Sequence, residues 1–112
     1  MVRPTNFEIT EDREGAKLTL SLQGELDMHT LGRLSERLAA QLEAGAKEVT
    51  LDLRKLAFMD SSGLRLLIEL HDRSRTDDWT LKLICPEQET AALVLRATGA
   101  DKFLPFLPAA EP

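Results

Sequence analysis

The sequence predicts a single α/β domain, in which a mixed, mostly parallel sheet of four to five strands is covered by about three to four helices. Three observations support this. The chain has 112 residues, close to the commonest size of one domain. Segments of alternating apolar and polar residues take turns with segments whose apolar residues lie three and four apart. The first two strand-like segments follow each other directly, and a hairpin there makes a parallel sheet mixed.

The chain begins with a predicted hairpin. Apolar and polar residues alternate over residues 7–10 and again over residues 17–22. The polar stretch Asp12–Gly15 between them ends in glycine and is typical of a turn. Residues 24–27, which read Gly-Glu-Leu-Asp, are expected to end the second strand and to lead into a loop.

A helix and a third strand follow. Leucines recur at spacings of three and four over residues 31–42, which predicts an amphipathic helix of about four turns. Thr30 is placed to serve as its N-cap. Residues 49–53 alternate between apolar and polar types and predict the third strand.

A second amphipathic helix is predicted from Leu64, because Leu67, Ile68 and His71 follow it at i+3, i+4 and i+7. Leu66 and Leu70 widen its apolar face, so we expect it to be buried on more than one side. Phe58 and Met59 precede it and are expected to anchor the end of the third strand in the core.

The last third contains a fourth strand at residues 81–84, a third helix at residues 87–98 and an apolar tail at residues 103–107. The tail has the composition of a short edge strand. We expect one domain over residues 1–112, with a core of roughly 6–107 and fraying at 108–112.

The overall composition excludes several classes of function. A net charge of −5 argues against binding to a phosphate backbone, although it would suit a basic protein partner. With four Phe, one Trp and no Tyr, the chain has little material for stacking nucleic-acid bases. We find no run long enough for a membrane span and no secretory start, so we expect a cytoplasmic protein.

No metal or cofactor site is expected. Cys85 is the only cysteine, so an internal disulfide is excluded and a zinc site would lack soft ligands. We expect Cys85 to end a buried strand as a small apolar residue. Trp79 is expected to cover the edge of the core, the alternative being a surface anchor for a partner.

The segment Asp60–Gly63 carries most of the functional information, because it joins a strand to a helix. Asp and Ser are preferred N-cap residues, so capping alone accounts for this composition. A catalytic serine is a second interpretation, but the Gly-x-Ser-x-Gly pattern is missing. The two histidines give no base: His71 lies about two turns along the same helix, and no spacing supports His29.

A third interpretation makes Ser61 a phosphate acceptor. A phosphate at a helix N-terminus would meet free backbone N–H groups and the favourable end of the helix dipole. It would also add roughly −1.5 to −2 charges beside Asp60. Arg65, in the first turn, is placed to pair with this charge or with a carboxylate of a partner, the alternative being a solvated helix face.

At this point two segments indicate a family. Residues 58–64 read Phe-Met-Asp-Ser-Ser-Gly-Leu, which resembles the signature of anti-anti-sigma factors, proteins that consist of a single STAS domain. Residues 24–27 resemble the loop that this family places near the serine. The resemblance extends to the order of the elements along essentially the whole chain.

The resemblance implies a mechanism without enzymatic activity in this chain. An anti-sigma factor with serine kinase activity would phosphorylate Ser61, and a PP2C-type phosphatase would reverse the reaction. The unphosphorylated form would bind the anti-sigma factor and free a sigma factor. Asp27 and Asp60 would shape the acceptor site, and Ser62 and Gly63 would start the helix at the docking surface. The alternative is a STAS scaffold without the switch, in a signalling or lipid-transport complex.

Overall fold

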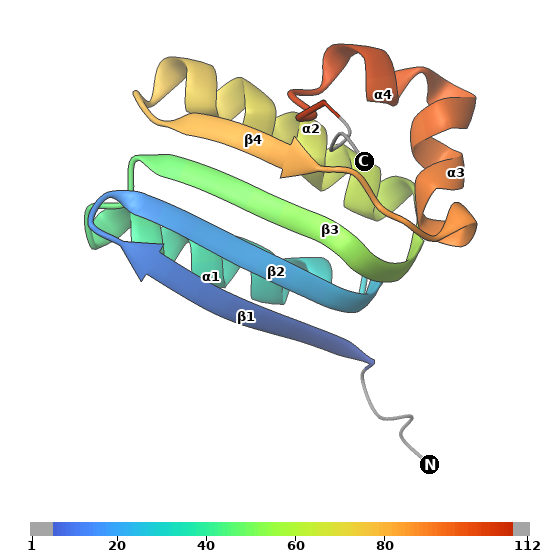
Figure 1. The fold of residues 1–112 in the computed structure, drawn as a ribbon, viewed down its shortest axis with the longest axis horizontal. Coiled ribbons are helices and arrows are strands. Elements are labelled where there is room, and N and C mark those ends of the chain that lie inside the picture. Colours follow the sequence, from blue (N-terminus) through green and yellow to red (C-terminus); the bar gives the residue numbers. More distant parts are fainter. Residues whose placement is uncertain (1–5, 109–112) are drawn as a thin grey trace.

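The computed structural model describes residues 6–108, which form one mixed four-stranded sheet with helices (Figure 1). The strands lie in the order β1 (Phe7–Glu14), β2 (Lys17–Leu26), β3 (Glu48–Met59) and β4 (Thr80–Ile84). β1 pairs with β2 in antiparallel fashion, and β2, β3 and β4 are parallel. The predicted fold class is therefore confirmed, with the hairpin as the antiparallel part.

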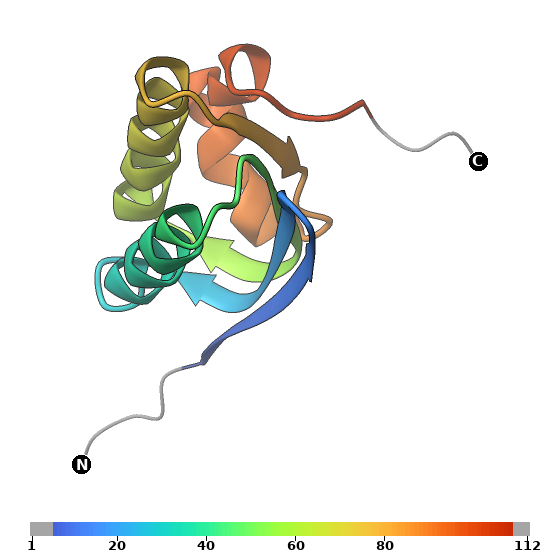
Figure 2. The same cartoon turned by 90° about the vertical axis from the view of Figure 1, so that its left-hand side faces the viewer.

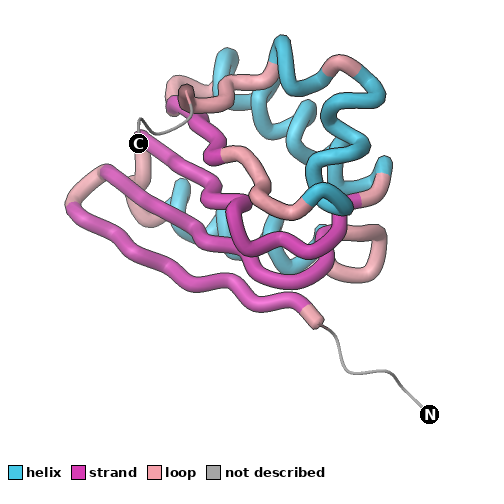
Figure 3. The backbone as a smooth tube through the Cα atoms, turned by 45° about the vertical axis from the view of Figure 1, so that its right-hand side comes forward, coloured by secondary structure: helices cyan, strands magenta, loops and turns pink. Residues whose placement is uncertain are grey.

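The helices are α1 (Leu31–Glu43), α2 (Ser61–Thr76), α3 (Glu89–Thr98) and the short α4 (Ala100–Phe103). Seen along the sheet, the helices lie on one side of it (Figure 2). The other face of the strands is left uncovered by helices, as the tube drawing also shows (Figure 3). One face of the sheet is therefore buried against the helices, and the other face is exposed to solvent.

The core follows from this arrangement. Along β2 and β3, inward side chains are buried aliphatic residues, and most of the residues between them are polar and partly exposed. Strand side chains alternate between the two faces, so a sheet covered on one side needs this pattern. The helical residues that complete the core include Leu34 and Leu38 of α1 and Leu67 and Leu70 of α2.

β1 and β3 are longer than their predicted alternating segments, because pairing with β2 extends them. β1 continues to Glu14, where a turn was expected, and its last residues pair with β2 although none of them is buried. β2 ends at Leu26, within the segment 24–27 that was expected to end it and to lead into a loop, so that prediction is confirmed. β3 runs on to Met59 and contains irregularities opposite Ser21–Gln23 and Gly24–Glu25.

The tail after α3 forms α4 first and reaches the sheet edge afterwards. The Leu83 N–H donates to the Pro105 carbonyl at 3.0 Å, and the Leu107 N–H donates to the Leu83 carbonyl at 2.8 Å. This parallel bridge to Phe106 is a reduced form of the expected edge strand. The expected fraying at 108–112 falls outside the described residues except for Pro108.

Two single-residue predictions have opposite outcomes. Trp79 is buried at the edge of the core, as expected. Cys85 is exposed, so the prediction that it is buried was wrong. β4 ends at Ile84, and Cys85 already belongs to the loop that leads to α3, where no alternation directs a side chain inward.

No helix in the described part of the chain is long and apolar enough to cross a membrane.

Candidate functional site

The segment after β3 forms a tight helix start. Asp60 is the N-cap of α2, and its Oδ1 accepts hydrogen bonds from the backbone N–H groups of Ser62 (2.9 Å) and Gly63 (3.1 Å). Its backbone carbonyl accepts the Leu64 N–H at 3.1 Å. Such a cap stabilises a helix by about 1 kcal/mol. The capping interpretation of Asp60 is therefore confirmed.

This cap corrects one expectation about a phosphate at Ser61. The N–H groups of Ser62 and Gly63 already donate to the Asp60 carboxylate, so they are not free to receive an added phosphate. A charge added at Ser61 would instead stand beside the charge of Asp60. Such a charge would therefore act mainly on a molecule that binds at the start of α2.

Ser61 itself is accessible. It is the first residue of α2 and is exposed, whereas Ser62 is half-buried and Gly63 is buried. Arg65 lies one turn further along and is exposed. Among the described residues no ion pair involves Arg65, so its charge is available at this surface.

Gly63 lets α2 approach the end of β2 closely. A Cβ atom there would lie 2.7 Å from the Leu26 carbonyl oxygen and 2.9 Å from Met59 Cγ. The Asp60 N–H donates to the same Leu26 carbonyl at 3.3 Å. The two sequence motifs are thus joined, because Asp27 directly follows the residue on which α2 rests.

We expect Gly63→Ala to lower the stability of the protein by about 1 to 2 kcal/mol. Overpacking against a fixed carbonyl costs about 1–3 kcal/mol, and the better helix propensity of alanine returns up to about 1 kcal/mol. The matched control is Gly32→Ala in α1, where a Cβ would meet nothing within 4 Å. That change should be neutral or stabilising, by up to about 1 kcal/mol. Thermal unfolding followed by circular dichroism compares the two, and equal melting temperatures would contradict the close contact.

The loop between β2 and α1 is held by Asp27. Its Oδ1 accepts the His29 N–H at 2.9 Å, and its backbone carbonyl accepts the N–H groups of Thr30 (3.1 Å) and Leu31 (2.9 Å). Thr30 occupies the N-cap position, but its hydroxyl makes no capping bond. The hydroxyl donates instead to the Glu25 carbonyl at 2.8 Å. The Asp27 carboxylate therefore orders the loop that runs beside the start of α2.

Two exposed apolar side chains lie at the same edge of the sheet as Ser61. Met28, in the loop after β2, is 67% exposed, and Phe58, near the end of β3, is 42% exposed. The expectation that Phe58 anchors the core was wrong, whereas Met59 is buried as expected. The irregularity opposite Gly24–Glu25 adds a residue to β3 and pairs Phe58 with Glu25. The alternation that begins at Val49 puts Phe58 on the outward side and Met59 on the inward side when it is extended to the end of β3, whereas no periodic signal marks Met28 in its loop.

The hydrolase interpretation gains nothing from the structure. Within residues 6–108, no hydrogen bond joins Ser61 to either histidine. His29 is exposed in the β2–α1 loop, and His71 lies further along α2. No group of three or more metal-ligating side chains is arranged around a common point among the residues that the structure describes.

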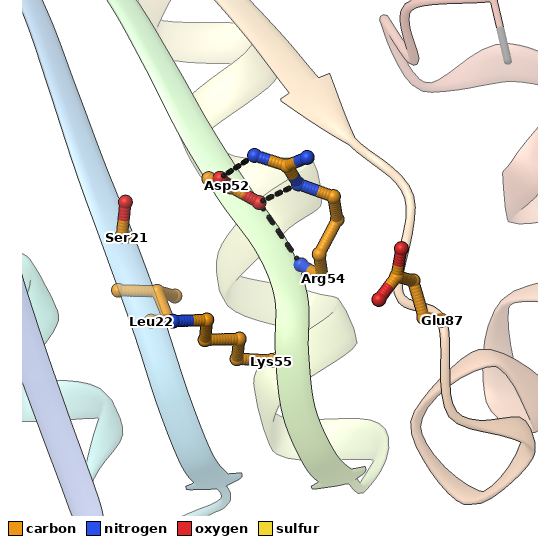
Figure 4. A pocket seen from close by; sticks show the side chains of 6 residues that line it. All are labelled: Ser21, Leu22, Asp52, Arg54, Lys55 and Glu87. Carbon is orange, nitrogen blue, oxygen red and sulfur yellow. Dashed lines mark hydrogen bonds and ion pairs between the residues drawn. The ribbon is translucent and has the colours of Figure 1, made fainter. Parts of the chain in front are cut away.

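A hollow of about 330 Å³ lies on the open face of the sheet (Figure 4). There Arg54 donates from Nε to Asp52 Oδ1 at 3.0 Å and from Nη2 to Asp52 Oδ2 at 2.8 Å. These hydrogen bonds lower the pKa of the Asp52 carboxyl against partial burial, which raises it. Of the four charged side chains that line this hollow, Asp52 and Arg54 are thus engaged with each other.

Known proteins resemble this chain both in sequence and in fold. The family model described as the STAS domain matches residues 8–111. A Bordetella bronchiseptica protein, BtrV, which carries the provisional name of an anti-sigma factor antagonist, is 29% identical over 105 residues. The match spans 94% of this chain and 87% of that protein.

Solved structures of similar fold include two anti-sigma factor antagonists. One, from Mycobacterium paratuberculosis, has a TM-score of 0.79 at 20% identity and covers 97% of this chain and 92% of its own. The other, SpoIIAA in its unphosphorylated form, has a TM-score of 0.74 at 22% identity. The match covers 93% of this chain and 90% of the SpoIIAA chain. At these identities the likeness concerns the fold.

Proposed function

This chain belongs to the STAS domain family, and from that premise we propose that it is a cytoplasmic anti-sigma factor antagonist switched by phosphorylation of Ser61. In its unphosphorylated form it binds an anti-sigma factor with serine kinase activity and thereby releases a sigma factor. Phosphorylation ends the binding, and a PP2C-type phosphatase restores it. The observation that carries the proposal is an exposed serine at the first position of α2, beside a capping aspartate.

The surroundings of Ser61 support a protein partner. Met28 and Phe58 expose apolar surface at the edge of the sheet where Ser61 lies. Large exposed side chains of these types are typical of interface cores. Arg65 adds a positive charge that can pair with a carboxylate of the partner. The interface is therefore centred on the helix start, with Ser61 inside it.

The chemistry needs only a hydroxyl from this chain. The Ser61 Oγ attacks the γ-phosphorus of ATP bound to the kinase, its proton passes to a base of the kinase, and ADP leaves. Asp60 keeps the helix start rigid while this happens, because its side chain is bound to two backbone N–H groups. The product carries its new charge on the surface that the partner has to contact.

Kinase labelling of purified variants tests the acceptor. We expect radioactive phosphate from ATP to enter the wild type and Ser62→Ala, and to be absent from Ser61→Ala, because only Ser61 is exposed at the helix start. Mass spectrometry then assigns the phosphate to Ser61. The kinase is the ATPase-domain protein captured from the native host by the wild-type chain. Labelling of Ser61→Ala at the normal rate would show that another residue is the acceptor.

The same capture separates this proposal from a scaffold without a switch. An antagonist captures an ATPase-domain partner with wild-type and Ser61→Ala baits and carries phosphate on Ser61. A scaffold in a signalling or lipid-transport complex captures the same partners with every variant and carries no phosphate. In that case Asp60 and Ser61 serve as a helix start only.

A further inference from the structure

A second hollow in the described part of the chain lies away from Ser61, between the loop after β4 and the segment after α4. Its volume is about 640 Å³, within the range of about 300–1,000 Å³ found for small-molecule sites. Its lining combines apolar side chains with two carboxylates, namely Ile84, Pro86, Phe106, Leu107, Glu87 and Asp101.

The Asp101 carboxylate lacks a partner. Its Oδ1 is buried and makes no hydrogen bond to any described residue. A buried acceptor without a donor is uncommon in folded proteins, because losing water without replacement is unfavourable. Asp101 also forms no ion pair among the described residues. Oδ1 itself is closed to solvent, but no hydrogen bond from a described residue reaches either oxygen of this carboxylate, which lines the hollow. The carboxylate as a whole is therefore unengaged and can meet a donor that enters the hollow.

Two neighbouring cations are already engaged. The Arg54 guanidinium lines the hollow but binds both carboxylate oxygens of Asp52, as its position in Figure 4 shows. Arg96, a second nearby cation, is paired with Glu89. The four residues after Pro108 read Ala-Ala-Glu-Pro and carry no cationic side chain. Lys102 follows Asp101 in α4 and is exposed, and no ion pair joins it to Asp101 among the described residues.

We propose that this hollow binds a small amphipathic cation, in which a primary amine or guanidinium is carried on an apolar ring or short alkyl chain. The cation donates to Asp101, with Glu87 adding negative charge, and the apolar part packs against Phe106, Leu107 and Pro86. The site is separate from the interface at Ser61 and does not depend on the switch.

Cys85 makes the proposal directly testable, because it lines the same hollow and is the only cysteine of the chain. Thiol–disulfide exchange attaches small probes to its thiol in the presence of excess 2-mercaptoethanol. Probes with the same phenyl body and an amine, a hydroxyl or a carboxylate compete for the thiol. Partial burial, together with the Asp101 carboxylate, raises the pKa of the Cys85 thiol, so the exchange is run at pH 8.5.

We expect the amine probe to be retained at least tenfold better than the carboxylate probe. Asp101→Asn should bring this ratio close to one, and Phe106→Ala should weaken retention of all three probes. Ratios are compared within each variant, because Asp101→Asn also changes the reactivity of the thiol. Circular dichroism confirms that each variant is folded. Equal retention of amine and carboxylate by the wild type, or a preference that survives Asp101→Asn, would overturn the proposal.

Binding without a covalent link completes the test. In Cys85→Ser, 2-phenylethylamine should produce saturable amide shifts at Glu87, Asp101 and Leu107, at least tenfold tighter than 3-phenylpropionate. If tethered amines are preferred but the free amine does not bind, the hollow takes a lysine or arginine side chain of a macromolecule. That result would overturn the assignment to a small molecule.

Discussion

Ser61→Asp is expected to weaken binding to the anti-sigma factor more than about a hundredfold while leaving the fold intact. A loss of about 3 kcal/mol of binding free energy is sufficient for this. The charge would enter at the centre of the proposed interface, next to the charge of Asp60. The N–H groups of Ser62 and Gly63 already donate to the Asp60 carboxylate. They are therefore not available to form hydrogen bonds with the new carboxylate at residue 61.

Stability should hardly change in Ser61→Asp. Ser61 is exposed, and an acidic residue in the first turn is favoured by the helix dipole by about 0.3–1 kcal/mol, which offsets repulsion from Asp60. The circular-dichroism spectrum and melting temperature should therefore stay close to those of the wild type. An effect on binding alone marks a change at an interface rather than a loss of structure.

Isothermal titration calorimetry against the captured partner measures the effect. Ser61→Asn is the matched control, because it has nearly the size of aspartate without its charge, and we expect it to retain most of the affinity. Ser61→Ala should bind like the wild type and resist inactivation by the kinase. Tight binding by a folded Ser61→Asp protein would remove the case for an electrostatic switch.

Gly24→Ala is expected to cause the largest loss of stability, about 2 to 5 kcal/mol. Gly24 has a φ of 102°, and a Cβ atom there would lie 1.9 Å from the Asn6 carbonyl oxygen. The left-handed conformation costs a residue with a side chain about 1–2 kcal/mol, and the overlap adds about 1–3 kcal/mol. It would also displace the Glu25 N–H from the Asn6 carbonyl, which it now meets at 2.8 Å.

Thermal unfolding tests this prediction, with Gly15→Ala as the control. Gly15 also has a positive φ, of 61°, but a Cβ there would meet nothing within 4 Å. Gly15→Ala therefore reports the conformational cost alone, whereas Gly24→Ala adds the close approach of Asn6. A melting temperature roughly 10 °C or more below the wild type is expected for Gly24→Ala. Equal melting temperatures for the two variants would show that β1 does not press on Gly24 in solution.

Much of the fold was predictable because its signals are local. Alternation over residues 17–22 and 49–53 and the leucine spacing over residues 31–42 report which side of a segment faces the core. Segments without alternation give no local signal for a strand or for the side to which a side chain points. The exposed half of β1 is strand only because β2 lies beside it, and between Leu53 and Met59 the alternation of β3 is interrupted by two extra residues, opposite Ser21–Gln23 and Gly24–Glu25.

The sequence by itself determined the order of the elements, the aspartate cap and a serine at the start of α2, because each depends on residues that are close along the chain. Only the tertiary structure decided that Gly63 packs against the Leu26 carbonyl and that Gly24 packs against the Asn6 carbonyl. It also decided that Cys85 and Asp101 line the same hollow. These contacts join segments far apart in the sequence. Their geometry is set by how strands and helices pack, and no local pattern encodes it.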